Sequence, residues 1–417
     1  MSDLFWPGDE RAGELMSESA LLHAMVRVES AWLAALVAVG IAGPDAAEGL
    51  EVLVVADDVP GVAARSEAGG NPVIPLLALL RERLQQRNPT AAAWLHRGLT
   101  SQDVLDTALI LCAGDAVARL RGELAAQIRA VTGLTERHRA SLMVGRTLAQ
   151  HAVPITFGLK AAMWLQGLLD AADDVGTAEL PSQFGGAAGS LAAPTELAAL
   201  AGLDDAPRRA HELVAHASAA LGLPARPPWH TSRAPITRIG DILVRCTDAW
   251  GRIANDVLTL SRPEIAELAE PTADGRGSSS AMPQKRNPVL SVLIRRAALT
   301  APTTGAQLHL AAAESSDERP DGAWHAEWAA LRTLTRRTVV AASQSTELLT
   351  GLDVDAHQMR STLDSVSDDV LAERRSLSAL FDGAATAPDD PATYLGANDL
   401  IIDAVLERAS DCLGRIS

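Results

Sequence analysis

Apolar side chains recur every three or four positions along most of the chain, whereas strand-like alternation of apolar and polar residues is scarce. Residues 12–40 show the pattern clearly, and the run ends at Gly40. This period places the apolar side chains on one face of a helix. Alanine and leucine dominate, and aromatic residues make up only 3% of the chain, which favours long, close-packed helices. The sequence therefore predicts an all-α fold.

Further segments with the same period follow, separated by turn-forming residues. The predicted helices cover residues 74–87, 100–131, 154–172, 233–262, 288–314, 323–350, 355–364, 367–381 and 393–415. In the helix that runs to residue 172 we expect Pro154 to lie in the first turn, where its missing N–H would have no partner in any case. The longest helices are thus expected in the middle of the chain.

Shorter predicted pieces before residue 95 and after Gly351 flank these long helices. We place domain boundaries near residues 95–100 and 350–355. The predicted domains are an N-terminal helical domain (1–98), a central long-helix bundle (99–352) and a small C-terminal helical domain (353–417).

The predicted helix 288–314 is apolar nearly all round, with little polar surface except Arg295 and Arg296. A helix of this kind is normally buried. In a chain of this size we expect it to be buried against other subunits. The sequence therefore predicts an oligomer.

Composition and charge narrow the classes of partner. The net charge of −16 argues against nucleic acid. The longest apolar run, Trp32–Gly43, is too short to span a bilayer, and the first residues lack the basic and apolar regions of a signal peptide. The chain has three cysteines, which are widely scattered and do not have the spacing of metal ligands: Cys112, Cys246 and Cys412. We expect a reduced, cytoplasmic protein with no metal and no membrane partner.

The segment 275–288 reads Gly-Arg-Gly-Ser-Ser-Ser-Ala-Met-Pro-Gln-Lys-Arg-Asn-Pro and precedes a long predicted helix. Asn287 is expected to cap that helix, and Pro288 suits its first position. Hydroxyls, amides and the Lys285 ammonium can then gather around an anion near a positive helix end. A plain linker is the alternative, but Met-Pro-x-Lys-x-Asn-Pro is far from linker composition. Lys285 is one of only two lysines beside 34 arginines.

Two other polar segments, 98–103 and 145–151, also lie next to long predicted helices. Thr100 and Asp103 form a pattern like a capping box, so helix capping is the plain interpretation of the first segment. The three polar segments are far apart in sequence. In one helix bundle these three segments could meet only if they came from different ends of the bundle or from different subunits. This geometry indicates a site shared between protomers.

With these three segments in order, the chain resembles the fumarase/aspartase superfamily, which carries recurring motifs around Thr-Ser-x-Asp, Gly-x-Thr and Gly-Ser-Ser-x-Met-Pro-x-Lys-x-Asn-Pro. Within it, the chain is most similar to the bacterial 3-carboxy-cis,cis-muconate cycloisomerase branch. The supporting segments are Gly98–Thr107, Gly145–His151, Gln183–Ala188, Trp229–Arg233 and Arg319–Trp328. The resemblance implies a three-domain all-helical protomer, a homotetramer around a central 20-helix bundle, and sites assembled from three chains.

Two departures from the superfamily pattern matter. Ser278 stands where a glycine is usual, so the motif's serine pair is Ser279 and Ser280. Leu148 stands where fumarases and adenylosuccinate lyases carry a histidine. The cycloisomerase branch typically lacks that histidine, so the second departure favours this branch.

The resemblance implies a cycloisomerase, in which one carboxylate of 3-carboxymuconate adds to a double bond while a proton is delivered to carbon. The difficult species is an aci-carboxylate, so positive potential must gather on that carboxyl group. Ser279 is expected to handle the carbon proton, and His151 is the imidazole nearest the vacant position. The residues expected to bind the polycarboxylate substrate are His96, Thr100, Ser101, Gln102, Thr147, Gln150, Arg233, Ser280, Lys285, Arg286, Asn287 and Arg319. No cofactor is expected.

Two rival interpretations stay open on the sequence alone. Adenylosuccinate lyase would need a proton donor for its leaving amine and a phosphate site, and Leu148 speaks against it. A non-catalytic structural protein on the same scaffold is the other rival. The joint presence of Ser279, Lys285 and Asn287 argues against it.

Overall fold

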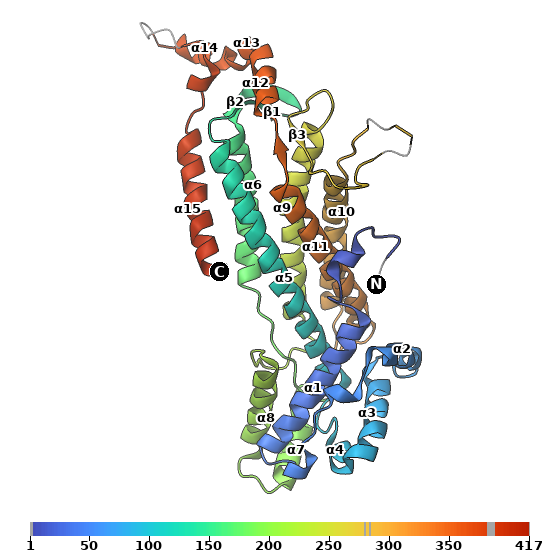
Figure 1. The fold of residues 1–417 in the computed structure, drawn as a ribbon. Coiled ribbons are helices and arrows are strands. Elements are labelled where there is room, and N and C mark those ends of the chain that lie inside the picture. The colour runs from blue at the N-terminus through green and yellow to red at the C-terminus, as the bar shows by residue number, and fades with distance from the viewer. Residues whose placement is uncertain (1–2, 279–280, 283–284, 382–387, 417) are drawn as a thin grey trace. The chain divides into compact units, whose positions relative to one another are not determined.

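The computed structural model describes residues 3–278, 281–282, 285–381 and 388–416. Helices dominate these residues, which confirms the all-α class (Figure 1). The α-helices are α1 (Glu18–Ala38), α2 (Val59–Ser66), α3 (Val73–Arg87), α4 (Pro89–Trp94), α5 (Ser101–Arg137), α6 (Phe157–Gly176), α7 (Ala192–Leu200), α8 (Ala206–Leu221), α9 (Ala234–Leu260), α10 (Val289–Ala313), α11 (Gly322–Thr350), α12 (Ala356–Ser365), α13 (Ser367–Val370), α14 (Ala372–Ser378) and α15 (Asn398–Ile416).

Short strands and 3₁₀ turns join these helices. The strands are β1 (Leu142–Thr147), β2 (Gln150–Thr156), β3 (Leu268–Ala269) and β4 (Asp353–Val354). The 3₁₀ turns are Asp9–Ala12, Pro44–Ala46, Glu51–Leu53, Ala56–Asp58, Glu67–Gly69 and Pro391–Thr393. β1 pairs with β2, and β3 with β4, both antiparallel.

The chain divides into two compact units, each built from three stretches of sequence. Unit 1 comprises residues 1–118, 178–241 and 303–337; unit 2 comprises 119–177, 242–302 and 338–417. Four of the five divisions fall inside α5, α9, α10 and α11, and the fifth follows α6. The three sequential domains that we expected from the pattern of helix lengths stay a prediction.

Unit 1 has α1 in its interior, packed against α8. By length and composition alone α1 is the one helix among the described residues that could cross a membrane. Its side chains Val28, Trp32 and Leu36 are buried, however, and the Trp32 ring stacks on Phe184 with centroids 5.2 Å apart. The helix therefore packs as a core element of this unit.

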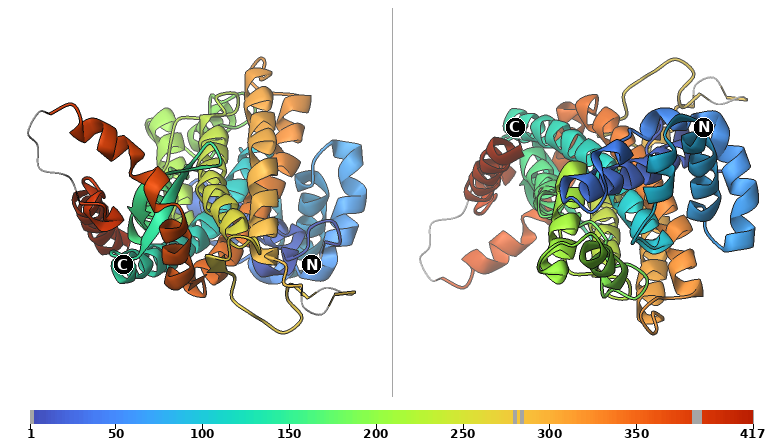
Figure 2. Two further views of the ribbon diagram at one scale, coloured as in Figure 1. Left: turned by 90° about the horizontal axis from the view of Figure 1, so that it is seen from above. Right: turned by 90° about the horizontal axis from the view of Figure 1, so that it is seen from below.

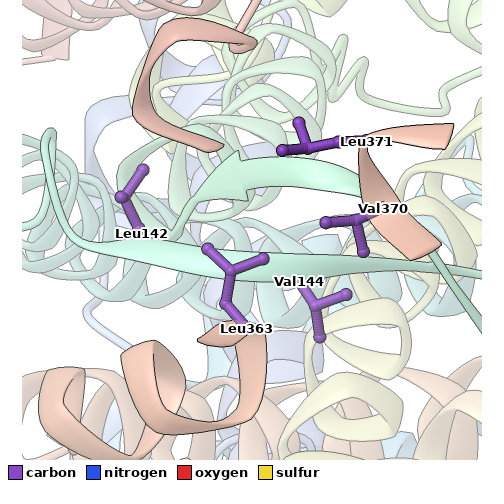
Figure 3. Close-up of a cluster of buried hydrophobic side chains, with 5 residues drawn as sticks. All are labelled: Leu142, Val144, Leu363, Val370 and Leu371. Carbon is purple, nitrogen blue, oxygen red and sulfur yellow. The ribbon is translucent and has the colours of Figure 1, made fainter. Parts of the chain in front are cut away.

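Unit 2 holds a cluster that joins the C-terminal part of the chain to the first hairpin. Leu142 and Val144 of β1 pack with Leu363 of α12 and with Val370 and Leu371 (Figure 3). In the same unit, α15 lies beside α6 (Figures 1 and 2). Two arginines of α15 bind acidic side chains of α6 through Arg408–Asp170, Arg408–Asp173 and Arg415–Asp173. The C-terminal helices are thus fixed to the hairpin and to α6.

One local prediction was wrong. Residues 145–156 form most of a β-hairpin, and the following helix begins only at Phe157, so Pro154 lies in β2 rather than in a first helical turn. A two-stranded sheet has an unpaired edge on both strands, so proline is tolerated there. The turn consists of Leu148 and Ala149, whose φ angles are +49° and +64°.

Candidate functional site

Thr100 and Arg319 lie together in unit 1. Thr100 immediately precedes α5 and is buried, while Arg319 lies exposed ahead of α11. Arg319 Nη1 donates a hydrogen bond of 2.9 Å to Thr100 Oγ1, and the guanidinium lies 5.2 Å from the centroid of the Trp324 ring. The ring therefore holds an exposed cation beside the N-terminus of a 37-residue helix.

Asp103 organises the surroundings of Thr100. Its buried carboxylate accepts hydrogen bonds from the backbone N–H of Thr100 at 3.0 Å and from those of Gly185 and Gly186, both at 2.9 Å. His230 Nε2 lies 2.9 Å from the same carboxylate. The capping interpretation of Thr100 with Asp103 is thus part of a larger arrangement. Sequence reasoning gave Asp103 only a capping role, although the Thr-Ser-x-Asp motif was the available signal for more.

The other residues predicted near Thr100 differ in exposure. Gln102 is buried and donates to the His230 carbonyl at 2.9 Å and to Asp106 at 3.3 Å, so it faces the interior. Ser101, the first residue of α5, is half-buried. His96 Nδ1 lies 2.6 Å from Glu29 Oε1, and its φ is +63°. The side chains of Ser101 and His96 are therefore the more accessible ones.

Arg233 is a correction to the predicted substrate-binding set. Its guanidinium is fully buried between Asp106, at 2.7 and 3.0 Å, and Glu327, at 2.7 to 3.1 Å. Burial by itself lowers the pKa of Arg233, but the two carboxylates outweigh it and raise that pKa. Trp324 Nε1 also donates to Asp106 at 2.8 Å. The cation is therefore committed to internal carboxylates and is not available to a substrate.

The hairpin of unit 2 presents three predicted residues at its tip. Thr147 pairs with Gln150 across the two-residue turn, and His151 pairs with Arg146. The side chains of Thr147, Gln150 and His151 are all exposed. Leu148, at the position where other branches of the superfamily carry histidine, is 97% exposed.

The segment 275–288 is closed at its neck. Asn287 donates to the Gly277 carbonyl from its backbone N–H at 2.9 Å and from Nδ2 at 3.2 Å, and Ser278 forms an isolated β-bridge with Arg286. Lys285 and Arg286 are exposed and Asn287 is half-buried. Ser279 and Ser280 lie outside the described residues. The backbone thus brings Lys285 and Arg286 to the mouth of a narrow loop.

The predicted cap of α10 was wrong. Asn287 is tied back to Gly277, and Pro288 precedes the helix, which begins at Val289. Glu270 supplies the cap instead, accepting from the backbone N–H groups of Leu290 at 2.9 Å and Ser291 at 2.6 Å. The positive end of this helix is therefore already complemented by a carboxylate of the same unit.

The structure thus gives two groups of predicted site residues. Unit 1 holds His96, Thr100, Ser101, Gln102 and Arg319, and unit 2 holds Thr147, Gln150, His151, Lys285, Arg286 and Asn287. Among the described residues, His, Cys, Asp and Glu side chains form no group of three that could hold a metal ion. All three cysteines are free and buried, and burial raises the pKa of both Cys112 and Cys246 to about 12. These thiols are unsuited to nucleophilic chemistry.

Comparison with known proteins decides the family. A protein-family model described as "Lyase" matches residues 58–302. The chain belongs to the fumarase/aspartase superfamily. A nitrosuccinate lyase of Streptomyces davaonensis is 43% identical over 363 residues, which are 86% of this chain and 76% of that one. A 3-carboxy-cis,cis-muconate cycloisomerase of Bradyrhizobium diazoefficiens is 39% identical over 319 residues, 76% of this chain and 68% of that one.

Solved structures of this superfamily show the same fold. A 3-carboxy-cis,cis-muconate lactonizing enzyme from Pseudomonas putida superposes with a TM-score of 0.82 at 28% sequence identity, and the match covers 96% of this chain and 97% of that one. The superfamily acts on small polycarboxylates, and this member is a lyase-family enzyme. The relatives therefore support an enzyme rather than a structural protein, while they differ in the reaction named.

Proposed function

We propose that the protein is a cycloisomerase that converts 3-carboxy-cis,cis-muconate to 4-carboxymuconolactone, a step of protocatechuate degradation in the β-ketoadipate pathway. The observation that carries the proposal is Leu148, an apolar side chain at the hairpin tip where a superfamily histidine would stand. A reaction whose departing or attacking group is a carboxylate needs no proton donor there. The cycloisomerases among the relatives support the same choice.

The proposed mechanism is an addition within one molecule. A substrate carboxylate oxygen forms a bond to one carbon of the double bond, the π electrons move toward the neighbouring carboxyl group, and the resulting aci-carboxylate takes up a proton at carbon. Ser279 handles that proton, and Lys285, Asn287 and Arg319 stabilise the carboxylates. Thr100, Ser101, Thr147, Gln150, Ser280 and Arg286 supply further hydrogen bonds. The step is redox-neutral and needs no cofactor.

We further propose that the active form is a cytoplasmic homotetramer with sites shared between subunits. The support lies on α10, where Val292, Leu299 and Leu310 are 52%, 68% and 67% exposed in the single chain. Apolar side chains this exposed, repeated along one helix, favour burial against another copy. The exposed tip residues Thr147, Gln150 and His151 then receive their partners from a neighbouring protomer.

Elimination of nitrite from nitrosuccinate is a second candidate, favoured by the 43% identical relative. In that reaction a proton leaves the carbon beside a carboxylate, the neighbouring C–N bond breaks, and nitrite and fumarate result. Nitrite is a stable anion that departs without protonation, so Leu148 is compatible with this reaction as well. The choice between the two candidates therefore needs a direct assay.

Purified protein should be incubated separately with 3-carboxymuconate, nitrosuccinate and adenylosuccinate, following the ultraviolet spectrum and released nitrite. We expect loss of the muconate absorbance alone. Nitrite release without muconate turnover would establish the second candidate, and turnover of adenylosuccinate alone would overturn both. Ser279→Ala is expected to lower kcat about 10²- to 10⁴-fold. An unchanged rate would remove Ser279 from the mechanism.

A further inference from the structure

Two carboxylates of one short segment in unit 2 bind two separate pieces of the chain that carry predicted site residues. Glu267 and Glu270 flank β3, which pairs with β4. The backbone of Glu267 adds two hydrogen bonds, from its N–H to the Leu260 carbonyl at 2.9 Å and from the Asp355 N–H to its carbonyl at 3.1 Å. Backbone hydrogen bonds therefore hold this segment both to the end of α9 and to the residues around β4.

Glu267 holds the hairpin. Its carboxylate is fully buried and accepts two hydrogen bonds from Arg146, at 2.9 Å from Nη1 and 2.7 Å from Nη2. Arg146 immediately precedes Thr147, and the regular pairing of β1 with β2 is interrupted between Val144 and Arg146. A bidentate pair fixes both distance and angle. The hairpin is thus anchored next to its tip residues, at the point where its own ladder is weakest.

Glu270 holds the exit of the 275–288 loop. Its two oxygens accept from the Leu290 and Ser291 N–H groups, which have no partner within the first turn of α10. The helix start is continuous with Asn287, whose two hydrogen bonds to Gly277 close the neck of the loop. Movement of the Glu270 carboxylate would therefore move the base of the loop that carries Lys285.

We propose that Glu267 and Glu270 act together as one positioning unit that couples the hairpin to the 275–288 loop. Glu267 and Glu270 lie at the two ends of β3, so their carboxylates can bind two different pieces of the chain from one short segment. Because two residues paired with β4 separate Glu267 from Glu270, displacement of either carboxylate is expected to shift the backbone that carries the other. The functional meaning of the coupling rests on the proposed function, since both pieces carry proposed substrate-binding residues.

Amide hydrogen exchange measured by mass spectrometry tests the coupling without any substrate. Glu270→Gln keeps the shape of the side chain, and Arg146→Lys keeps its charge while losing the bidentate geometry. We expect Glu270→Gln to increase exchange at the start of α10 and also in residues 142–156. We expect Arg146→Lys to increase exchange in residues 142–156 and also at the start of α10. The control Glu264→Gln, at an exposed glutamate of the same stretch, should match the wild type. Peptides from α6 report whether each variant is folded.

Effects confined to each variant's own piece would overturn the coupling. Turnover gives a second readout, with whichever substrate the wild type converts. Each single variant should lower kcat/KM about tenfold through misplacement of binding groups. The double variant should lose about the same factor if the two carboxylates act as one unit, whereas about a hundredfold loss would mean that they act independently. If no substrate is converted, the proposed function fails while the exchange experiment still decides the coupling.

Discussion

Around Asp103 and Arg233 the charged side chains of unit 1 are buried and paired, whereas at the hairpin tip of unit 2 Thr147, Gln150 and His151 are exposed. The first arrangement is complete within one chain, because charges there are matched by charges and backbone N–H groups. The second offers hydrogen-bonding groups that the single chain leaves facing solvent. The buried group in unit 1 is therefore preorganised by pairing within the chain, whereas the hairpin tip of unit 2 is held from its base, by the Arg146–Glu267 pair and by the packing of Leu142 and Val144.

The largest expected effect concerns the buried pairing. Arg233→Met leaves Asp106 and Glu327 facing each other in the interior without their common cation, which should cost about 3–5 kcal/mol of unfolding free energy. Urea unfolding followed by circular dichroism measures it. The control Arg238→Met removes an exposed arginine of α9, five residues further along the chain, and should change stability by less than about 0.5 kcal/mol. Similar costs for both variants would mean that the buried pairing of Arg233 adds no stability beyond that of an exposed arginine.

Arg319→Met tests the exposed cation that lies beside Thr100 in unit 1. The Arg319 side chain is exposed and its hydrogen bond to Thr100 is partly buried, so we expect only a small change in stability. Loss of a charged contact to a substrate carboxylate should lower kcat/KM roughly ten- to a hundredfold. Steady-state kinetics measures the loss. Arg319→Lys, which retains the charge, should have a kcat/KM between those of the wild type and Arg319→Met. Full activity in Arg319→Met would remove this residue from the binding set.

The hairpin turn offers a test from the exposed side. Leu148 and Ala149 both have positive φ, a conformation that Asn-Gly adopts at lower cost. The double change Leu148→Asn with Ala149→Gly should therefore raise the unfolding free energy by roughly 1–2 kcal/mol. Leu148→Ala alone, which removes the side chain and keeps most of the strain, is the control. Destabilisation by both variants would instead mean that Leu148 is covered in the assembled protein.

The smallest expected effect is a pH dependence in unit 2. Burial, and then the charge of Arg137, lower the pKa of His138 below its usual 6.5. The unfolded chain then binds a proton more readily, so this histidine removes stability as the pH falls from about 6.5 through its lowered pKa. Thermal unfolding between pH 5 and pH 8 should show a shallower acid decline in His138→Gln than in the wild type. If the acid decline is the same in His138→Gln, groups other than His138 cause it.

Most of the fold could be predicted, because helical periodicity is strong over long segments such as 233–262, which matches α9 closely. The hairpin was missed because its turn, Leu148-Ala149, lacks the glycine or asparagine that signals such turns. The sequence contains the Thr100 and Arg319 motifs, and the structure brings these two residues into contact.

The remaining differences have a common physical cause. Arg233 looked like a substrate-binding cation because Asp106 and Glu327, which neutralise it, are more than ninety residues away along the chain. The cap of α10 comes from Glu270, which is placed by the pairing of β3 with β4, not by its neighbours in sequence. In both cases the tertiary structure brings the partner residue close. Rules for helix capping or charge pairing that consider only neighbours in sequence cannot identify such a partner.

The buried cysteines have a practical consequence. Cys112 belongs to unit 1 and Cys246 to unit 2, and each thiol is at most 4% exposed with its pKa raised to about 12 by burial. Burial therefore slows the reaction of either sulfur with a thiol reagent, and separation of the surrounding helices should speed it up. Labelling rates of these two native cysteines would report the opening of each unit separately, with no engineered probe and no need to know the substrate.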